Sequence, residues 1–394
     1  MTVGANIIQT LLLYTVYYSV YSTSIVELTV DNFDSSIKEN KCMLIYANKT
    51  DCEKCKLLYH KFLIAAQTFE NDKNILFGRI SDEMLLQAFE VTSFPGILYY
   101  EYGSAVPKLY LGDITSAALT KLMSDAVKTD FRKLDRQHSI KLTSSTFEEI
   151  MNTERQARLV MLHEADDIDE IELYEEIAET YDNENDIIIA RINVDEERKL
   201  RKQYNAIVYP SFYWYPKGTH SKKKRYGGEL NIPQMISFIN KQCNFYRTKG
   251  GRLNPYAGLI KPLDDVINIY GKDLYEITNI ARIRTEIKRE MTQLSSDIDY
   301  ELAEFYLALV NEIEEDRTIE ILDENRSRIY RQMDGAGPLE LDQLIRKKNI
   351  VQKFIDIIGN HLLEELTEGN TGELIDLDKY YGFEDHGLEF HEEL

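Results

Sequence analysis

Two cysteines, Cys52 and Cys55, stand two residues apart in the stretch TDCEKCK and form the one C-x-x-C pattern of the chain. Such a pair can cycle between a dithiol and a disulfide, or it can supply two of the four ligands of a structural zinc ion. A zinc ion would need two more ligands near the pair, and His60 alone does not provide them. We therefore predict thiol–disulfide exchange at this pair, and we expect no metal and no cofactor.

Exchange starts with attack by a thiolate, which requires an accessible cysteine of lowered pKa. The sequence predicts a helix over residues 52–69, so Cys52 stands at a helix N-terminus, where unpaired N–H groups and the helix dipole favour negative charge. Cys55 lies one turn later and is expected to be the more buried, resolving cysteine. The residues between them, Glu53 and Lys54, place one charge of each sign beside the attacking sulfur.

The chain has two further cysteines, Cys42 and Cys243. Cys42 lies in the strand-like run 41–46, which predicts a buried inert thiol, and Cys243 follows the helical segment 233–242. A disulfide between these two stays open as an alternative. Four cysteines are too few for a protein stabilised by disulfides, which favours a protein that acts on the cysteines of others.

An internal repeat organises the first 245 residues, because two segments show the same order of predicted elements. The first copy has predicted strands at 25–30, 43–47, 75–80, 97–102 and 108–111, and helices at 32–38, 52–69, 82–90 and 116–127. The second copy has predicted strands at 159–163, 186–194, 211–215 and 224–226, and helices at 167–181, 196–204 and 232–241. Phe94-Pro95 in the first copy corresponds to Tyr209-Pro210 in the second, 115 residues later.

This order of elements, with the C-x-x-C between the central strand and its helix, resembles the thioredoxin plan, and the chain resembles the protein disulfide isomerase family. The resemblance implies an α/β fold of two tandem thioredoxin-like domains followed by an all-α C-terminal domain. Residues 25–130 would carry the redox dithiol, 138–245 would be redox-silent and 252–360 would be helical. The resemblance also implies that Phe94-Pro95 is cis, faces the dithiol and holds a substrate strand against Cys52.

Several residues depart from the family pattern. Members usually have Trp before the first cysteine and Gly-His between the pair, where this chain has Asp51 and Glu53-Lys54. Leu44 stands where the family keeps a buried Glu, and the segment 110–114 lacks the family's Arg near the last strand. We therefore expect a weaker oxidant than usual, with slow release of mixed disulfides.

The second copy has no cysteine at the position of the dithiol, where it reads Asp-Asp-Ile-Asp-Glu at 166–170. It cannot exchange disulfides, and the resemblance implies that it binds unfolded chains. Tyr209 and Pro210 are the candidate client-binding residues, joined by the aromatic run 212–215, of which at least half must be strand core. The helical domain carries no predicted catalytic residue; by resemblance it is a binding module and a site for homodimer formation.

Both ends of the chain suggest the endoplasmic reticulum lumen. The apolar run 7–20 predicts a signal peptide over residues 1–24, with an uncleaved membrane anchor as the alternative. Residues 361–394 read as an acidic tail, which ends in His391, Glu392, Glu393 and Leu394, a tetrapeptide similar to the sequences bound by a retrieval receptor. The net charge of −21 argues against nucleic acid as a partner.

Two N-glycosylation sequons begin at Asn48 and Asn325. Both remain candidates, because a sequon can stay unmodified.

Two classes of function remain open. The first is an oxidoreductase and isomerase that forms, reduces or rearranges disulfides in unfolded or disulfide-containing secretory proteins. The second is a largely non-catalytic chaperone or escort that binds client polypeptides. The cysteine pair favours the first, and the missing Glu and Arg favour the second.

Overall fold

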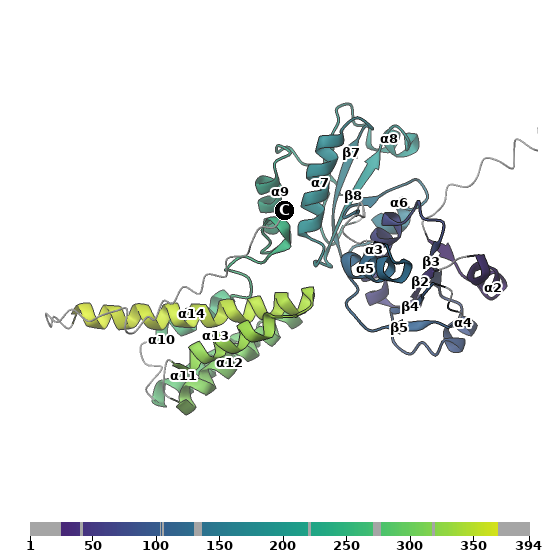
Figure 1. Ribbon diagram of the computed structural model, residues 1–394. Coiled ribbons are helices and arrows are strands. Elements are labelled where there is room, and N and C mark those ends of the chain that lie inside the picture. Colours follow the sequence, from purple (N-terminus) through teal and green to yellow (C-terminus); the bar gives the residue numbers. More distant parts are fainter. Residues whose placement is uncertain are drawn as a thin grey trace, which may run out of the picture. The chain divides into compact units, whose positions relative to one another are not determined.

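The structure, a computed structural model, describes residues 25–39, 42–102, 104, 106–129, 136–219, 222–270, 277–316 and 320–368 (Figure 1). It divides into two compact units: the first runs to Ala257 and includes Ala336–Gln343, and the second comprises Gly258–Gly335 and the chain from Leu344. The predicted signal peptide and the retrieval tetrapeptide lie outside the described residues. No helix within the described ranges is long and apolar enough to cross a membrane.

The first domain is built on a mixed sheet in the order β1-β3-β2-β4-β5. Its strands are β1 (Val26–Glu27), β2 (Cys42–Ala47), β3 (Ile75–Ile80), β4 (Gly96–Tyr100) and β5 (Lys108–Tyr110), and its helices are α2 (Val30–Glu39), α3 (Glu53–Thr68), α4 (Glu83–Ala88) and α5 (Ser116–Val127). The central strand β2 is apolar along its whole length and buried on both faces. Its parallel pairing with β3 and antiparallel pairing with β4 fix the end from which the chain runs into α3.

The second domain repeats this arrangement with the sheet order β10-β9-β7-β8-β6. Its strands are β6 (Ile140–Lys141), β7 (Ala157–His163), β8 (Ile187–Asn193), β9 (Ser211–Tyr215) and β10 (Lys224–Arg225), and its helices are α6 (Phe147–Met151), α7 (Ile168–Thr180), α8 (Arg198–Tyr204) and α9 (Ile232–Cys243). The predicted α/β class with two tandem thioredoxin-like domains is confirmed.

The structure differs from the predicted elements mainly in short segments. β6 and α6 were not expected, because elements of two and five residues give too few positions for a periodic pattern. The strand predicted at 25–30 is reduced to Val26–Glu27, since Asn32 Oδ1 accepts the N–H of Thr29 at 2.8 Å where helix α2 begins.

Helix α3 carries several of the contacts between the two domains. Gln67 exchanges two hydrogen bonds with the backbone of Lys141 on β6, at 2.9 and 3.0 Å. Lys141 also pairs with Glu70 just after α3, with 2.6 Å between Nζ and Oε1. Lys61 is buried, and its ammonium donates to the backbone carbonyl of Asp182. Since polar partners from both domains satisfy these groups, the dithiol helix is fixed to the second domain.

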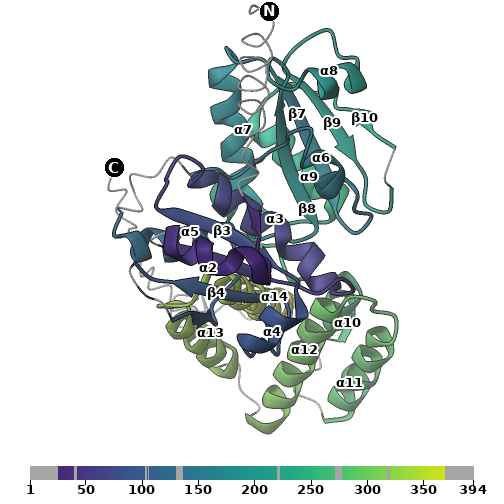
Figure 2. The ribbon, with the colours of Figure 1, turned by 90° about the vertical axis from the view of Figure 1, so that its right-hand side faces the viewer.

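The second unit is helical, which confirms the all-α C-terminal domain. Its helices are α10 (Lys261–Tyr270), α11 (Ile277–Met291), α12 (Asp297–Asp316), α13 (Glu320–Met333) and α14 (Pro338–Glu368). Figure 2 shows α11 beside α12, and both bury an apolar stripe of helical period, such as Ile280, Ile283 and Ile287 on α11. Helix α14 continues past the predicted domain end at 360, so the first residues of the predicted tail are helical.

Residues 336–343 belong to the first unit, which the predicted helical span of 252–360 did not anticipate. The physical reason is a buried ion pair. Arg247, with a side chain 1% exposed, donates to both carboxylate oxygens of Asp342 at 2.9 and 2.6 Å, and to Glu184 at 2.7 Å. Burial alone would lower the pKa of Arg247, but the hydrogen bond to Asp342 and the two carboxylate charges raise it.

Candidate active site

The structure places Cys52 and Cys55 at the start of α3, joined in a disulfide. Cys52 is the N-cap residue, and its Sγ accepts the backbone N–H of Cys55 at 3.0 Å. Cys52 is partly exposed, whereas Cys55 is only 2% exposed. The two sulfurs are therefore unequal: an incoming disulfide can reach Cys52, and Cys55 can attack only from within.

The segment between β2 and α3 is what presents Cys52. Asn48 follows β2 directly and donates its backbone N–H to the carbonyl of Ile80 at 3.0 Å, and the N–H of Cys52 donates to the carbonyl of Lys49 at 3.1 Å. This turn delivers the first cysteine at the N-terminus of a sixteen-residue helix, where free N–H groups and the helix dipole stabilise a thiolate.

Phe94-Pro95 is a cis peptide bond, and so is Tyr209-Pro210. The pairing of Ala47 with Gly96 places the Phe94-Pro95 turn beside the end of β2, from which the chain leads to Cys52. Phe94 is half-buried against the same core as Cys52, and Lys49 Nζ lies 4.5 Å from the centre of its ring. The dithiol and the cis proline thus lie at the same end of the sheet.

The charges around the dithiol come from both domains. Glu53 accepts a hydrogen bond from Lys56 on its own helix, with 3.1 Å between Nζ and Oε1, and forms an ion pair with Arg155 of the second domain, with 3.1 Å between Nε and Oε2. The hydrogen bond from Lys56 and the charge of Arg155 lower the pKa of Glu53. Lys54 is exposed and forms no salt bridge among the described residues. Sequence reasoning missed Arg155, since nothing in the repeat brings it to this site.

The position at which the family keeps a buried Glu is apolar here. Leu44 is fully buried on β2 and paired with Phe77 and Tyr99 on the neighbouring strands. The hydroxyl of Tyr46 contacts the backbone of the buried cysteine, donating to the carbonyl of Cys55 at 2.7 Å. Burial raises the pKa of Tyr46, so this hydroxyl stays protonated and does not take a proton from Cys55.

Replacing Tyr46 with Phe is expected to lower the free energy of unfolding by about 1 kcal/mol, the net worth of one buried hydrogen bond. Urea unfolding of the oxidised protein measures this loss. Tyr256→Phe, whose side chain is 68% exposed, is the matched control. Equal stability of the two variants would show that the hydroxyl does not stabilise the start of α3.

The second domain has a corresponding end of its sheet without cysteines. The segment 166–170 contains the start of α7, and the pairing of Leu162 with Ser211 places Tyr209-Pro210 at the same end of the sheet. The described residues contain no group of His, Cys, Asp or Glu that could hold a metal ion. This end instead exposes apolar side chains: Ile168 is 61% exposed, Ile207 91% and Val208 61%.

The aromatic run 212–215 is not a surface. All four side chains are buried, so the expectation that part of the run is available to clients is wrong. Strand β9 lies between β7 and β10, and its alternate side chains enter two different cores: Phe212 and Trp214 face one, Tyr213 and Tyr215 the other. Tyr209 and Pro210 are half-buried at the edge of the exposed apolar group.

The alternative disulfide between Cys42 and Cys243 is wrong, because both are free. Burial raises the pKa of the Cys42 thiol and raises that of Cys243 to about 12, so both stay protonated.

The prediction that Asn325 is a glycosylation site is wrong. Asn325 is 2% exposed within α13, and its amide donates to Glu312 and to the carbonyl of Ile321. A glycan cannot be accommodated there. Glycosylation of the half-buried Asn48 stays a prediction.

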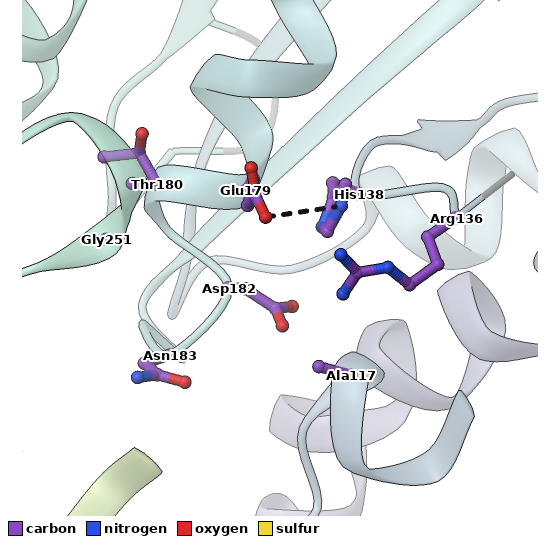
Figure 3. A pocket seen from close by; sticks show the side chains of 9 residues that line it. Ala117, Arg136, His138, Glu179, Thr180, Asp182, Asn183 and Gly251 are labelled. Carbon is purple, nitrogen blue, oxygen red and sulfur yellow. Dashed lines mark ion pairs between the residues drawn. The ribbon is translucent and has the colours of Figure 1, made fainter. Parts of the chain in front are cut away.

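A cavity of about 160 Å³ lies where the two domains of the first unit meet (Figure 3). Its lining residues are Ala117, Arg136, His138, Glu179, Thr180, Asp182, Asn183, Gly250 and Gly251. His138 Nε2 lies 3.9 Å from Glu179 across it. None of the predicted site residues lines this cavity. The candidate active site is therefore the dithiol at the start of α3, which lies outside the cavity.

Known proteins resemble this chain in sequence. Residues 24–125 and 171–241 match the Thioredoxin family. A probable protein disulfide-isomerase A6 of Medicago sativa is 24% identical over 86% of this chain and 94% of its own length. Protein disulfide-isomerase 1 of Dictyostelium discoideum is 24% identical over 84% of this chain and 93% of its own. The zinc-bound form of human ERp44 matches 56% of this chain and 60% of its own length at 16% identity, with a TM-score of 0.23.

Three independent findings now agree. The fold repeats the thioredoxin arrangement, the dithiol caps the helix after the central strand, and the relatives match over most of the chain. The chain is therefore similar to protein disulfide isomerases over most of its length, and it is a thiol–disulfide exchange enzyme.

Proposed function

We propose that the protein forms, reduces or rearranges disulfides of folding secretory proteins in the endoplasmic reticulum lumen through Cys52 and Cys55. This proposal rests on the different exposure of the two cysteines. Cys52 is the accessible cap of α3, and Cys55 is buried one turn behind it. The cis Phe94-Pro95 turn at the same end of the sheet supplies the edge along which a client strand would lie.

The proposed reaction needs no group beyond the two thiols. In reduction, the Cys52 thiolate attacks one sulfur of the client disulfide, forms a mixed disulfide and releases the other client sulfur as a thiolate. The Cys55 thiolate then attacks Cys52 Sγ, breaks the mixed disulfide and releases the second client thiolate. The protein loses two electrons and ends as the disulfide present in the structure, while the client gains two electrons and takes up two protons as its thiols form. Oxidation of a client is the reverse.

Clients would be held by the second domain. The support for this part of the proposal is the exposed apolar group formed by Ile168, Ile207 and Val208 around the half-buried Tyr209 and Pro210. Exposed apolar residues gathered at one end of a sheet fit a segment of unfolded polypeptide, which offers apolar side chains without a fixed shape.

The proposed compartment and other partners rest on sequence features. The apolar run 7–20 and the tetrapeptide 391–394 support residence in the endoplasmic reticulum and a contact with a retrieval receptor. Exposed apolar side chains of the helical unit would serve the proposed homodimer; they are Ile269, Ile298, Tyr300 and Tyr330.

Refolding of a disulfide-scrambled client tests this function. Cys52→Ala is expected to reduce the rate of recovery of native client to that of the uncatalysed reaction, because no accessible thiolate remains to open a client disulfide. The same variant should still suppress aggregation of the reduced client, since the apolar group of the second domain is unchanged. Undiminished refolding by both Cys52→Ala and Cys55→Ala would instead identify a chaperone or escort whose dithiol has no role in the reaction.

A further inference from the structure

A residue of the redox-silent domain reaches the dithiol. Arg155 Nε lies 3.1 Å from Glu53 Oε2, and Glu53 stands between the two cysteines in the sequence. The other oxygen of Glu53 is taken by Lys56 at 3.1 Å, so both oxygens of this carboxylate have a cationic partner. Without these partners, Glu53 would place an uncompensated negative charge beside the sulfur that must become a thiolate.

Arg155 is placed by its neighbour. Gln156 is only 2% exposed, and its side-chain amide donates to the carbonyl of Leu57 at 3.3 Å and to the carbonyl of Asn185 at 2.6 Å. Leu57 lies on α3, two residues after Cys55, and Asn185 lies in the second domain. The residue next to Arg155 is thus buried and tied to both domains, which fixes the backbone from which the guanidinium extends.

We infer that Arg155 is a positioning residue of the dithiol: by holding the Glu53 carboxylate, the second domain sets the charge beside Cys52. The inference rests on the proposed exchange at Cys52 and adds a residue to it. It assigns the second domain a part in the chemistry besides holding clients.

The exposure of Arg155 and Glu53 determines how strongly the loss of Arg155 should change the redox equilibrium of the dithiol. The side chains of Arg155 and Glu53 are 68% and 47% exposed, so solvent screens the pair and its energy is small. Charges that act on a thiolate nevertheless enter the redox equilibrium directly, because a less stabilised thiolate favours the disulfide over the dithiol. The effect should therefore appear as a change in equilibrium, not as a loss of fold.

The test is the equilibrium of the full-length protein with glutathione, together with the ultraviolet absorbance of the Cys52 thiolate as pH is varied. Arg155→Ala is expected to shift the equilibrium toward the protein disulfide by about two- to fivefold, the range for an exposed ion pair, and to raise the pH at which the thiolate forms. Arg155→Lys should retain most of the wild-type behaviour. In 1 M KCl, where the screening length falls to about 3 Å, the difference between Arg155→Ala and wild type should shrink.

Two controls separate this role from general support of the interface. Lys141→Ala breaks another ion pair between the domains, that with Glu70, and should leave the glutathione equilibrium unchanged. In a Glu53→Gln background, Arg155→Ala should have a smaller effect, because the carboxylate through which it acts is gone. An unchanged equilibrium in Arg155→Ala, or an equal shift in Lys141→Ala, would overturn the inference while leaving exchange intact. Failure of the wild-type protein to exchange with glutathione would overturn both this inference and the proposed function.

Discussion

Cys55→Ala protein is expected to become covalently trapped on its clients. Cys52 remains able to attack a client disulfide, because it keeps its place as the cap of α3. Release then depends on thiols from solution, since the resolving sulfur one turn away is missing. A well-placed intramolecular group acts at an effective concentration far above that of any free thiol, so release should slow by about a hundredfold or more.

Non-reducing electrophoresis of the full-length variants, after incubation with a disulfide-containing client and an alkylating quench, measures the trapped fraction. Cys52→Ala is the matched control and should trap nothing, because Cys55 is 2% exposed and cannot meet a client. The wild-type chain should lie between the two. Buried Leu44 stands where the resemblance implies a glutamate, whose carboxylate could take the Cys55 proton, so resolution is expected to be slow but present. Equal trapping by the two single variants would contradict the assigned order of attack.

Arg247→Ala is expected to lower the free energy of unfolding of the first unit by about 3–5 kcal/mol, the usual cost of removing one partner of a buried ion pair. Its guanidinium donates to Asp342, Glu184 and the carbonyl of Gly251, and it is 1% exposed. Truncation leaves two carboxylates, 15% and 8% exposed, without their cation. The loss comes chiefly from these uncompensated charges.

Urea unfolding followed by the fluorescence of the single Trp214, which lies in the core of the second domain, measures this loss. Lys249→Ala removes a nearby exposed pair with Glu176, whose side chains are 67% and 43% exposed, and should cost about 1 kcal/mol or less. Adding Glu184→Gln and Asp342→Asn to Arg247→Ala should restore part of the stability, because the stranded charges are then gone. If Arg247→Ala is as stable as Lys249→Ala, the buried pair does not hold residues 336–343 in the first unit.

The sequence was most informative where a local pattern decides the structure. The apolar run of β2 and the C-x-x-C after it were enough to place the dithiol at the start of α3, and the resemblance to the family implied the cis bond of the Phe94-Pro95 turn. Helix 116–127 and strands 75–80 and 211–215 have the predicted bounds. In these segments, period and local turn chemistry agree with the tertiary fold.

The sequence was least informative where partners distant in the chain decide the outcome. The alternation of side chains along 212–215 indicates a strand with two faces, but it does not show that other residues cover both faces. The sequon at Asn325 is a three-residue pattern that carries no information on burial inside a helix. Arg155 and Arg247 look like ordinary surface charges until the fold brings Glu53 and Asp342 to them.

Helix α3 is synthesised before the residues of the second domain that it contacts. Gln67 and the buried Lys61 find their partners in Lys141 and Asp182, which leave the ribosome much later than α3. Domains usually fold in the order of their synthesis. Here the polar face of α3 stays unpaired until the second domain, whose last helix ends at Cys243, has emerged, so the dithiol reaches its final surroundings only after well over half of the chain has been translated.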